Sequence, residues 1–211
     1  MKARYSYRIY PTPGQRKSLA QLFGCVRVVW NDALALCRQS VETRHGASLP
    51  KNSELQKICI TQAKKTVERE WLSKVSNIPL QQSIADLGVA FNNFFQSLKG
   101  NRKGKKVNPP RFKSRRSKQT ARFRKGGFKV KQDRVYLAKI GDIKTKWSRP
   151  LPSVPSSVTV IKDCANRYFL SFVVEIESEA RLAQHPSIGI DLGLKTFASC
   201  SNGEKINSPD Y

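Results

Sequence analysis

A 27-residue segment from Lys99 to Lys125 constrains the fold of this chain most, because it cannot form a core of its own. It contains 13 lysine or arginine residues and no aspartate or glutamate, together with several glycines and the sequence NPP. Like charges repel each other, and glycine and proline disfavour regular structure, so we expect an exposed, adaptable segment. The hydrophobic core must therefore come from the residues on either side of it.

The whole chain shares this excess of positive charge. Its 211 residues include 39 lysines and arginines against 15 aspartates and glutamates, which gives a formal net charge of +24. Such a charge favours a polyanionic partner, and nucleic acid is the usual one. No apolar run approaches the roughly 18 consecutive residues of a membrane-spanning helix. We therefore expect nucleic acid as the partner, with no membrane and no small-molecule substrate.

The cysteines point to a reducing compartment. Cys25, Cys37, Cys59, Cys164 and Cys200 are odd in number, widely spaced and free of any CxxC pair. This pattern is typical of reduced thiols and shows no zinc site. We therefore expect a cytoplasmic protein.

The N-terminal residues predict a strand followed by a long helix. Residues 3–10, ARYSYRIY, alternate in the manner of a short strand. Thr12 as N-cap, Pro13 at the first helical position and Gln15 reaching back to the cap predict the helix start. Apolar residues then recur at three- and four-residue steps as far as Cys37, which indicates one buried helical face.

Two more helices are predicted before the basic segment. Ser53 is a plausible cap for a helix that runs to about Arg69, and Pro79 opens another with an apolar face that ends near Leu98. We interpret these apolar stripes as a helical core.

Short strands follow the basic segment. FKV, RVYL and DIK are β-like, and SVTVIKD and RYFLSFVVEI form a clear hairpin pair. A lone first strand, a helical block and then more strands predict an α+β protein in which one β-domain is interrupted by a helical insertion. The expected parts are a first strand at 1–10, a helical insertion at 11–99, the basic segment with the remaining strands at 100–177, a polar linker at 178–187, and a last β-region at 188–211.

The basic segment is the candidate nucleic-acid-binding region. Lysine and arginine side chains that neutralise phosphates release counterions, and aromatic side chains among them offer stacking surfaces for unpaired bases. A solvated basic loop or a localisation signal is the alternative. The candidate contacts are Arg102, Lys103, Lys105, Lys106, Arg111, Phe112, Lys113, Arg115, Arg116, Arg122, Phe123, Arg124 and Lys125.

A single carboxylate stands out near the end of the chain, in the sequence IGIDLGLKTFASCSNG at 188–203. Ile188, Ile190 and Leu192 alternate with Gly189, Asp191 and Gly193, so one face of this strand is apolar and is expected to pack inward. An aspartate within an apolar strand is unfavourable unless it is paired or binds a metal. Three interpretations compete: a ribonuclease-H-like nuclease with two metal ions, an actin-like ATPase hairpin, and a structural aspartate bonded to nearby backbone.

An ordered series of motifs resembles the TnpB/OrfB proteins of bacterial insertion sequences. The sequence YRIYPTPGQ resembles the opening of that family, and FGCVRVVWNDALAL resembles its first helix. WLSKVSNIPLQQSIADLGVAFNNFF, GKKVNPPRFKSRRSKQTARF and IGIDLGLKTFASCSNGEKI are similar to its next block, its basic region and its first RuvC motif. Several long matches in the family's order are more specific than a lone aspartate.

The resemblance implies an RNA-guided DNA endonuclease of bacterial type that associates with the nucleoid in the cytoplasm. Such proteins grip guide RNA and target DNA with a wedge β-domain that carries a helical recognition insertion, and they cut with a RuvC domain that has three carboxylates and Mg²⁺. Asp191 matches the first carboxylate, so the resemblance makes it the catalytic and Mg²⁺-binding candidate. Gln81 and Gln82 lie in the block that helps to read the DNA motif beside the target.

The family's second and third carboxylates and its four-cysteine zinc ribbon have no counterpart in these 211 residues. Glu204 and Asp210 follow Asp191 at positions where the family has no ligands. We therefore expect a truncated member, with an incomplete RuvC domain, that binds guide RNA and DNA and does not cleave on its own. Whether it is an enzyme stays open. The alternatives are a stand-alone nucleic-acid-binding module or repressor-like protein, and a non-functional remnant of an interrupted gene.

Overall fold

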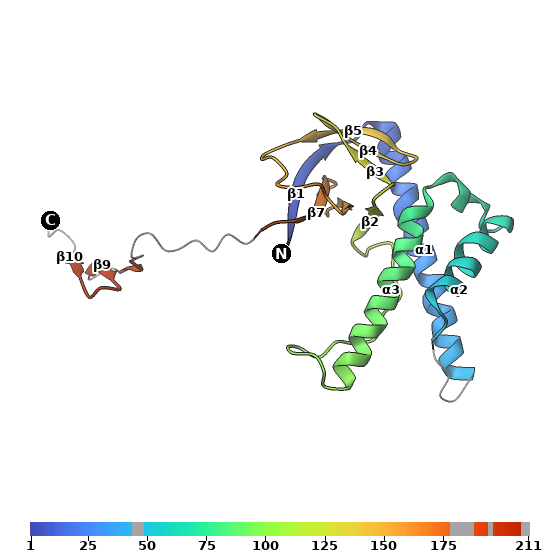
Figure 1. Ribbon diagram of the computed structural model, residues 1–211, viewed down its shortest axis with the longest axis horizontal. Coiled ribbons are helices and arrows are strands. Elements are labelled where there is room, and N and C mark those ends of the chain that lie inside the picture. Colours follow the sequence, from blue (N-terminus) through green and yellow to red (C-terminus); the bar gives the residue numbers. More distant parts are fainter. Residues whose placement is uncertain (44–48, 178–187, 194–195, 208–211) are drawn as a thin grey trace. The chain divides into compact units, whose positions relative to one another are not determined.

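The computed structural model describes residues 1–43, 49–177, 188–193 and 196–207 (Figure 1). The chain divides into two compact units, Met1–Ile176 and Glu177–Tyr211. The first unit combines helices with a seven-stranded sheet, and the second contains a three-stranded sheet. The expected linker at 178–187 lies outside the described residues.

Strand β1 (Lys2–Tyr10) organises the first unit because it pairs with two strands that follow more than 130 residues later. It pairs antiparallel with β7 (Tyr168–Glu175) along Lys2–Ile9 and with β5 (Gly141–Lys146) along Arg8–Tyr10. The predicted pairing of the first strand with those after residue 127 is confirmed. The full order is β2-β6-β7-β1-β5-β4-β3, with β2 at Gln119–Arg124, β6 at Ser157–Lys162, β4 at Arg134–Leu137 and β3 at Phe128–Val130.

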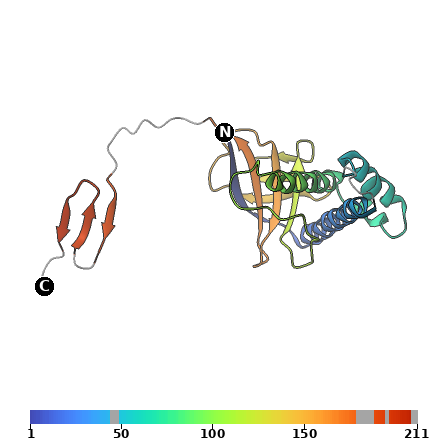
Figure 2. The ribbon, with the colours of Figure 1, turned by 90° about the horizontal axis from the view of Figure 1, so that it is seen from below.

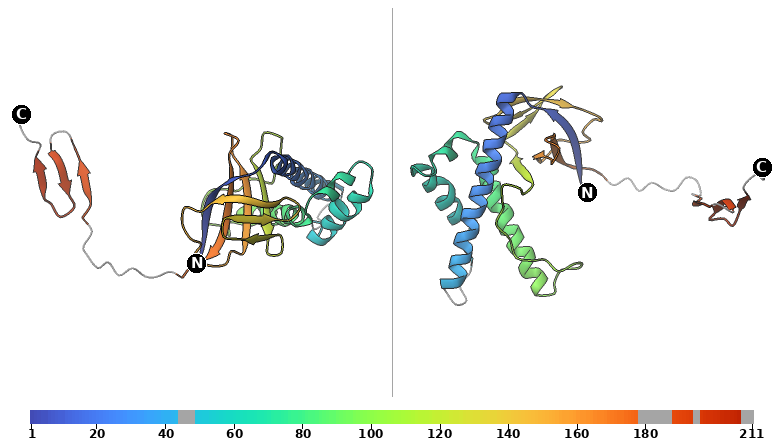
Figure 3. Two further views of the ribbon diagram at one scale, coloured as in Figure 1. Left: turned by 90° about the horizontal axis from the view of Figure 1, so that it is seen from above. Right: turned by 180° about the vertical axis from the view of Figure 1, so that it is seen from behind.

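The sheet curls on itself (Figures 2 and 3). Aromatic side chains fill the space that it encloses. Phe128 on the edge strand β3 lies with its ring centroid 6.4 Å from that of Phe172 on β7, although three strands separate β3 and β7 in the sheet. Tyr7 and Trp147 fill the space beside them, with ring centroids 4.7 Å apart. Curling thus lets one antiparallel sheet bury both of its halves against each other.

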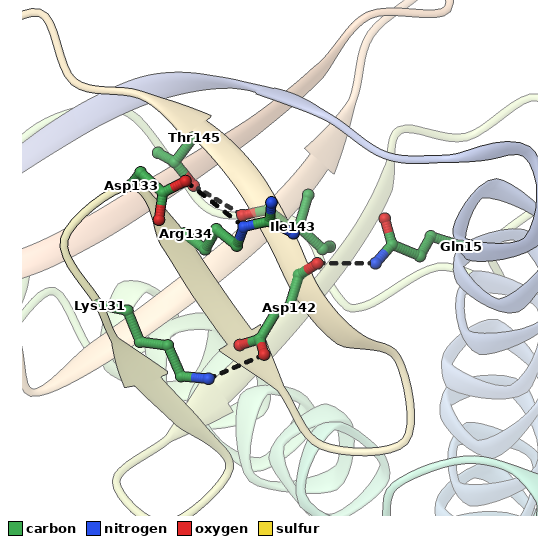
Figure 4. A network of polar contacts seen from close by, with 7 residues as sticks. All are labelled: Gln15, Lys131, Asp133, Arg134, Asp142, Ile143 and Thr145. Carbon is green, nitrogen blue, oxygen red and sulfur yellow. Dashed lines mark hydrogen bonds and ion pairs between the residues drawn. The ribbon is translucent and has the colours of Figure 1, made fainter.

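Helix α1 (Pro13–Thr43) begins with the predicted capping box. The backbone N–H of Thr12 donates to Oε1 of Gln15 at 3.0 Å, and the backbone N–H of Gln15 donates to Oγ1 of Thr12 at 3.3 Å. Nε2 of Gln15 also donates to the backbone carbonyl of Asp142 on β5 at 2.9 Å (Figure 4). In the same network Lys131 forms a 2.8 Å ion pair with the Asp142 carboxylate. The helix start is therefore fixed to the sheet.

Helix α3 (Asn77–Leu98) packs against α1 through its apolar face, as predicted. Leu80, Ile84 and Leu87 are fully buried. Between them in sequence, Ser83 donates its hydroxyl to the Val26 backbone carbonyl of α1 at 3.1 Å. This bond and the apolar contacts fix the two helices side by side (Figure 3).

The predicted helix from Ser53 to about Arg69 is confirmed only in part. Consecutive helical turns run from Asn52 to Lys65, but most of them are not α-helical. Helix α2 covers only Asn52–Gln56, its N-cap is Lys51 rather than Ser53, and no side chain caps it. A π-helical turn at Lys57–Gln62 and 3₁₀ turns at Ala63–Lys65 and Glu70–Lys74 follow. This region is rich in β-branched side chains, which lower helix propensity, and the Thr66 hydroxyl bonds the Ala63 carbonyl at 2.8 Å where the helical turns stop.

Helix α1 is long and apolar enough over Pro13–Ser40 to cross a membrane, if only length and composition are considered. Half of that apolar window is buried inside the first unit, where it packs against α3 and the sheet. Core packing accounts for its apolar character.

The second unit contains the predicted strands. They are β8 (Ile190–Leu192), β9 (Thr196–Cys200) and β10 (Lys205–Asn207), in the order β10-β9-β8. The apolar face of β8 was expected to pack inward, and this prediction is wrong for the described residues. Ile190 is 65% exposed and Leu192 is 70% exposed, because no described element of this unit covers them.

Thiol reactivity tests the packing of the first unit. Burial raises the pKa of Cys25 to about 11 and that of Cys59 to about 12, and burial also raises the pKa of Cys37. These thiols stay protonated at pH 8, and the thiolate is the reactive form. We expect the exposed Cys164 to react quickly with a thiol reagent and the three buried thiols to react only on unfolding. Fast reaction of all five thiols in the native protein would contradict this packing.

Candidate nucleic-acid interface

The basic segment has a free part and a docked part. Arg102, Lys103, Lys105 and Lys106 are exposed in loops, as predicted. From Pro110, which is buried, the chain instead lies along helix α1. The expectation of one exposed, adaptable segment is thus wrong for residues 110–113, which we call the docked segment. It is also wrong for Gln119–Arg124, which form strand β2.

Asn31 of α1 fixes the docked segment at Lys113. Its Nδ2 donates to the Lys113 backbone carbonyl at 3.0 Å, and its Oδ1 accepts from the Lys113 backbone N–H at 2.8 Å. One carboxamide thus satisfies both polar backbone groups of one residue, in the way a strand partner does.

Two further α1 side chains bond the carbonyl groups just before Lys113. Trp30 donates Nε1 to the Arg111 carbonyl at 3.0 Å, and Arg38 donates Nη2 to the Pro110 carbonyl at 3.4 Å. Arg38 also lies over the Phe112 ring, with its Cζ 4.7 Å from the ring centroid. Since Phe112 is 50% exposed, it presents an aromatic surface backed by a cation.

Lys113 is held in an environment that disfavours its charge. Its Nζ lies 3.6 Å from the centroid of the Trp30 ring. Burial lowers the pKa of Lys113, and the nearby Asp86 carboxylate opposes that shift. An anion that approached this side chain would therefore be stabilised more than at a fully solvated lysine.

Gln82 and Arg122 share one carboxylate. Nε2 of Gln82 donates to Oδ1 of Asp86 at 2.9 Å, and the Arg122 guanidinium forms an ion pair with the same carboxylate. Gln82 is only 5% exposed, whereas its neighbour Gln81 is partly exposed. Arg122 thus joins β2 to α3, whereas the Gln82 bond lies within α3. In this conformation Gln81 is the glutamine whose amide can reach a ligand.

The prediction that Phe123 stacks on a base is wrong. Its side chain is fully buried in the sheet core, because β2 alternates and places Ala121 and Phe123 inward. The cations around it, Arg115, Arg116, Arg124 and Lys125, are exposed as expected.

Asp191 lies on β8, opposite Ser199 of β9, and is exposed. Among the residues that the structure describes, no group of three or more His, Cys, Asp or Glu side chains is placed to hold a metal ion. A two-metal site needs several carboxylates that converge. The described residues therefore do not fit a Mg²⁺ site of that kind.

Comparison with known proteins assigns this chain to a family. A family model described as a helix-turn-helix domain, and named for OrfB of IS605, matches residues 1–46. A candidate RNA-guided DNA endonuclease of Streptomyces pristinaespiralis is 35% identical over the whole chain and 51% of its own length. InsQ of Escherichia coli (strain K12), also a candidate RNA-guided DNA endonuclease, is 30% identical over 97% of this chain and 49% of its own length. The chain belongs to the OrfB/TnpB family of insertion-sequence proteins.

Two further similarities are partial. Virulence protein VsdF of Salmonella dublin is 36% identical to the OrfB/TnpB chain over 93 residues, which are 41% of this chain and 76% of VsdF. A chain of the Cas12f1–sgRNA–target DNA complex is similar over 98% of this chain and 57% of its own, with 17% identity and a TM-score of 0.39. A score this low does not establish a shared fold. The chain spans about half the length of the two endonuclease relatives.

The segment matched by the family model has no turn between helices in its described part. Residues 1–43 of the OrfB/TnpB chain form strand β1 and then the single helix α1. The description of the family model as a helix-turn-helix domain therefore does not fit residues 1–43. In this structure α1 supports the docked segment.

Sequence reasoning missed several cations of this OrfB/TnpB chain that the fold brings together. Arg27 of α1, Lys118 just before β2 and Lys162 at the end of β6 line one pocket of about 270 Å³ with Lys113 and Arg115. Lys118 could have been found from the basic run. Arg27 and Lys162 are isolated in sequence, and only the pairing of Gln119 with Lys162 in the sheet brings β6 to this place.

Removing the Asn31 carboxamide should free the docked segment. We expect Asn31→Ala to lose two hydrogen bonds, each of which contributes about 0.5–1.5 kcal/mol. Trypsin should then cleave faster after Arg111, Lys113 and Arg115. The matched control is Asn92→Ala, at an exposed position on α3. Equal cleavage rates for the two variants would show that Asn31 does not hold the segment.

Phe112 should contribute to binding of single strands. We expect Phe112→Ala to weaken binding of a single-stranded RNA by on the order of 1–3 kcal/mol, the usual contribution of one stacked base. Binding of duplex DNA, whose bases are already stacked, should change less. Phe95→Ala is the control, since Phe95 on α3 is also partly exposed, at 39%. An equal loss with both nucleic acids, or with both variants, would exclude stacking on Phe112.

Proposed function

We propose that this OrfB/TnpB chain holds the guide RNA and the target DNA of an insertion-sequence RNA-guided DNA endonuclease. The docked segment carries this proposal. It fixes an exposed aromatic ring and several cations on the rigid face of α1, which is the combination that binds single-stranded nucleic acid. On this proposal the curled sheet is the wedge domain, residues 11–99 are the recognition insertion, and the protein acts in the cytoplasm at the nucleoid.

The names of the endonuclease relatives support the choice of RNA and DNA over other polyanions. The net charge of +24 supports the same choice. Gln81, which is partly exposed on α3, is the residue that we propose for reading the DNA motif beside the target.

We propose further that residues 1–211 alone do not cut. Asp191 is the family's first Mg²⁺-binding carboxylate in this proposal, but the described residues give it no partner carboxylates. A metal ion there would lack the ligands that hold it and activate water.

A stand-alone nucleic-acid-binding module, or a repressor-like protein, is the second candidate. The observation that favours it is that unit Met1–Ile176 has its own core and contains the whole interface described above. A non-functional remnant, in contrast, is expected to aggregate through the exposed apolar face of β8.

Purified residues 1–211 should bind RNA and DNA with a steep salt dependence and should leave a supercoiled plasmid intact in Mg²⁺. Retention of nucleic acid through moderate salt during purification is expected as well. Failure to bind either nucleic acid at low salt would contradict the main proposal. Plasmid nicking that Asp191→Ala abolishes would contradict the absence of cutting.

A further inference from the structure

A glycine inside helix α1 is unexplained by the packing of the protein. Gly24 lies in the middle of Pro13–Thr43, where glycine destabilises a helix relative to alanine. Apart from the adjacent residues and the backbone of its own helix, a Cβ atom at this position would meet no described heavy atom within 4 Å. Close packing against a neighbour, the usual reason for a helical glycine, therefore does not apply here.

Gly24 forms part of the wall of the 270 Å³ pocket between α1 and the segment that follows Lys113. The other lining residues include five cations and no carboxylate; they are Arg27, Lys113, Arg115, Lys118 and Lys162. Within the described part of the chain, none of these five forms an ion pair with an aspartate or glutamate. Asp86 lies near Lys113, but no carboxylate lines the pocket, so most of its positive charge is uncompensated.

The wall opposite α1 is preorganised. The Ser114 backbone N–H donates to Oγ of Ser117 at 2.9 Å, and the Ser117 backbone N–H donates to the Ser114 carbonyl at 3.1 Å. These bonds close a tight turn that carries Arg115, two residues after the anchored Lys113. Little ordering is then required when an anion enters, which favours binding.

An adjoining pocket of about 510 Å³ continues the same positive wall. It shares Arg115, Lys118 and Lys162 with the first pocket and adds Arg116. Its one carboxylate, Asp163, is occupied by Arg167, whose Nε lies 2.6 Å away. A strand that places one phosphate in the first pocket can therefore continue along cations into the second.

We propose that the pocket beside Gly24 binds a backbone phosphate of the nucleic acid, at a point where the strand passes directly against the α1 backbone. This inference rests on the proposed function and deepens it, since it assigns a specific phosphate subsite. The missing side chain at Gly24 leaves room for the phosphate, while Arg27, Lys118 and Lys162 neutralise it from three separate elements.

The test uses two independent variants of the full 211-residue chain. Gly24→Leu fills the pocket and should melt at or above the temperature of the parent, because leucine favours the helix more than glycine does. Lys118→Ala/Lys162→Ala removes the charge without filling the space. The control is Lys129→Ala/Lys144→Ala, which removes two exposed lysines from the other half of the sheet.

Binding of a single-stranded RNA and of a duplex DNA is measured for each protein from about 50 to 200 mM salt. We expect Gly24→Leu and Lys118→Ala/Lys162→Ala to weaken binding by about tenfold or more beyond the control. Loss of one phosphate contact should flatten the slope of log K against log salt by about 0.7 for RNA or about 0.9 for duplex DNA. The nucleic acid that shows the change is the source of the phosphate.

Two negative outcomes are distinguishable. If the parent binds neither nucleic acid, the proposed function itself fails. If the parent binds but Gly24→Leu and Lys118→Ala/Lys162→Ala behave like the control, the phosphate subsite is refuted and the proposed function stands.

Discussion

The interface depends on the pair of hydrogen bonds between the Asn31 carboxamide and the backbone of Lys113. The basic segment has 13 cations in 27 residues and few apolar side chains around Lys113 with which to attach itself to a core. Asn31 supplies a polar means instead, and Trp30 and Arg38 extend it along α1. Because the attachment uses backbone groups of the basic segment, the side chains of Phe112, Arg115 and Lys118 stay available to a ligand.

Helix α1 can support this segment because it is itself fixed at two points along its length. Gln15 bonds the Asp142 carbonyl at the start of the helix, and Ser83 of α3 bonds the Val26 carbonyl further along. Strand β1, which leads into α1, is paired on both sides by β7 and β5. The helices thus lie between β1 and β2 in the sequence, and both of these strands belong to one curled sheet. The sheet therefore determines where the cations of β6 and α1 come together.

Local patterns in the sequence predicted much of this fold. The Thr12–Gln15 capping box, the apolar stripe of α1 and the hairpin of β6 and β7 depend on residues close together in the chain, and all are confirmed. The helix predicted from Ser53 to about Arg69 ends early, at Lys65, and is α-helical only over Asn52–Gln56, because the predicted cap does not form and the β-branched residues disfavour an α-helix. Phe123 was misplaced because a charged neighbourhood hid the period-two alternation of β2.

The site was less predictable than the fold, because it is assembled from distant segments. The basic run showed where phosphates could bind, but not that Asn31, 82 residues earlier, holds the run in place. The residues beside Arg27, Lys162 and Gly24 in the sequence do not indicate a binding role for them. That role is inferred only because the fold brings the three residues to one pocket. Asp191, in contrast, is conspicuous in sequence, yet the described residues leave it without converging carboxylates.

Hydrogen–deuterium exchange of the free protein tests most directly whether the interface exists before nucleic acid binds. The Lys113 amide, which donates to Asn31 at 2.8 Å, should exchange far more slowly than the amides of 102–106, and RNA should slow exchange through 113–118 further. If the Lys113 amide instead exchanges in the free protein as fast as those of 102–106, the docked segment is not preformed and the account of this interface is wrong.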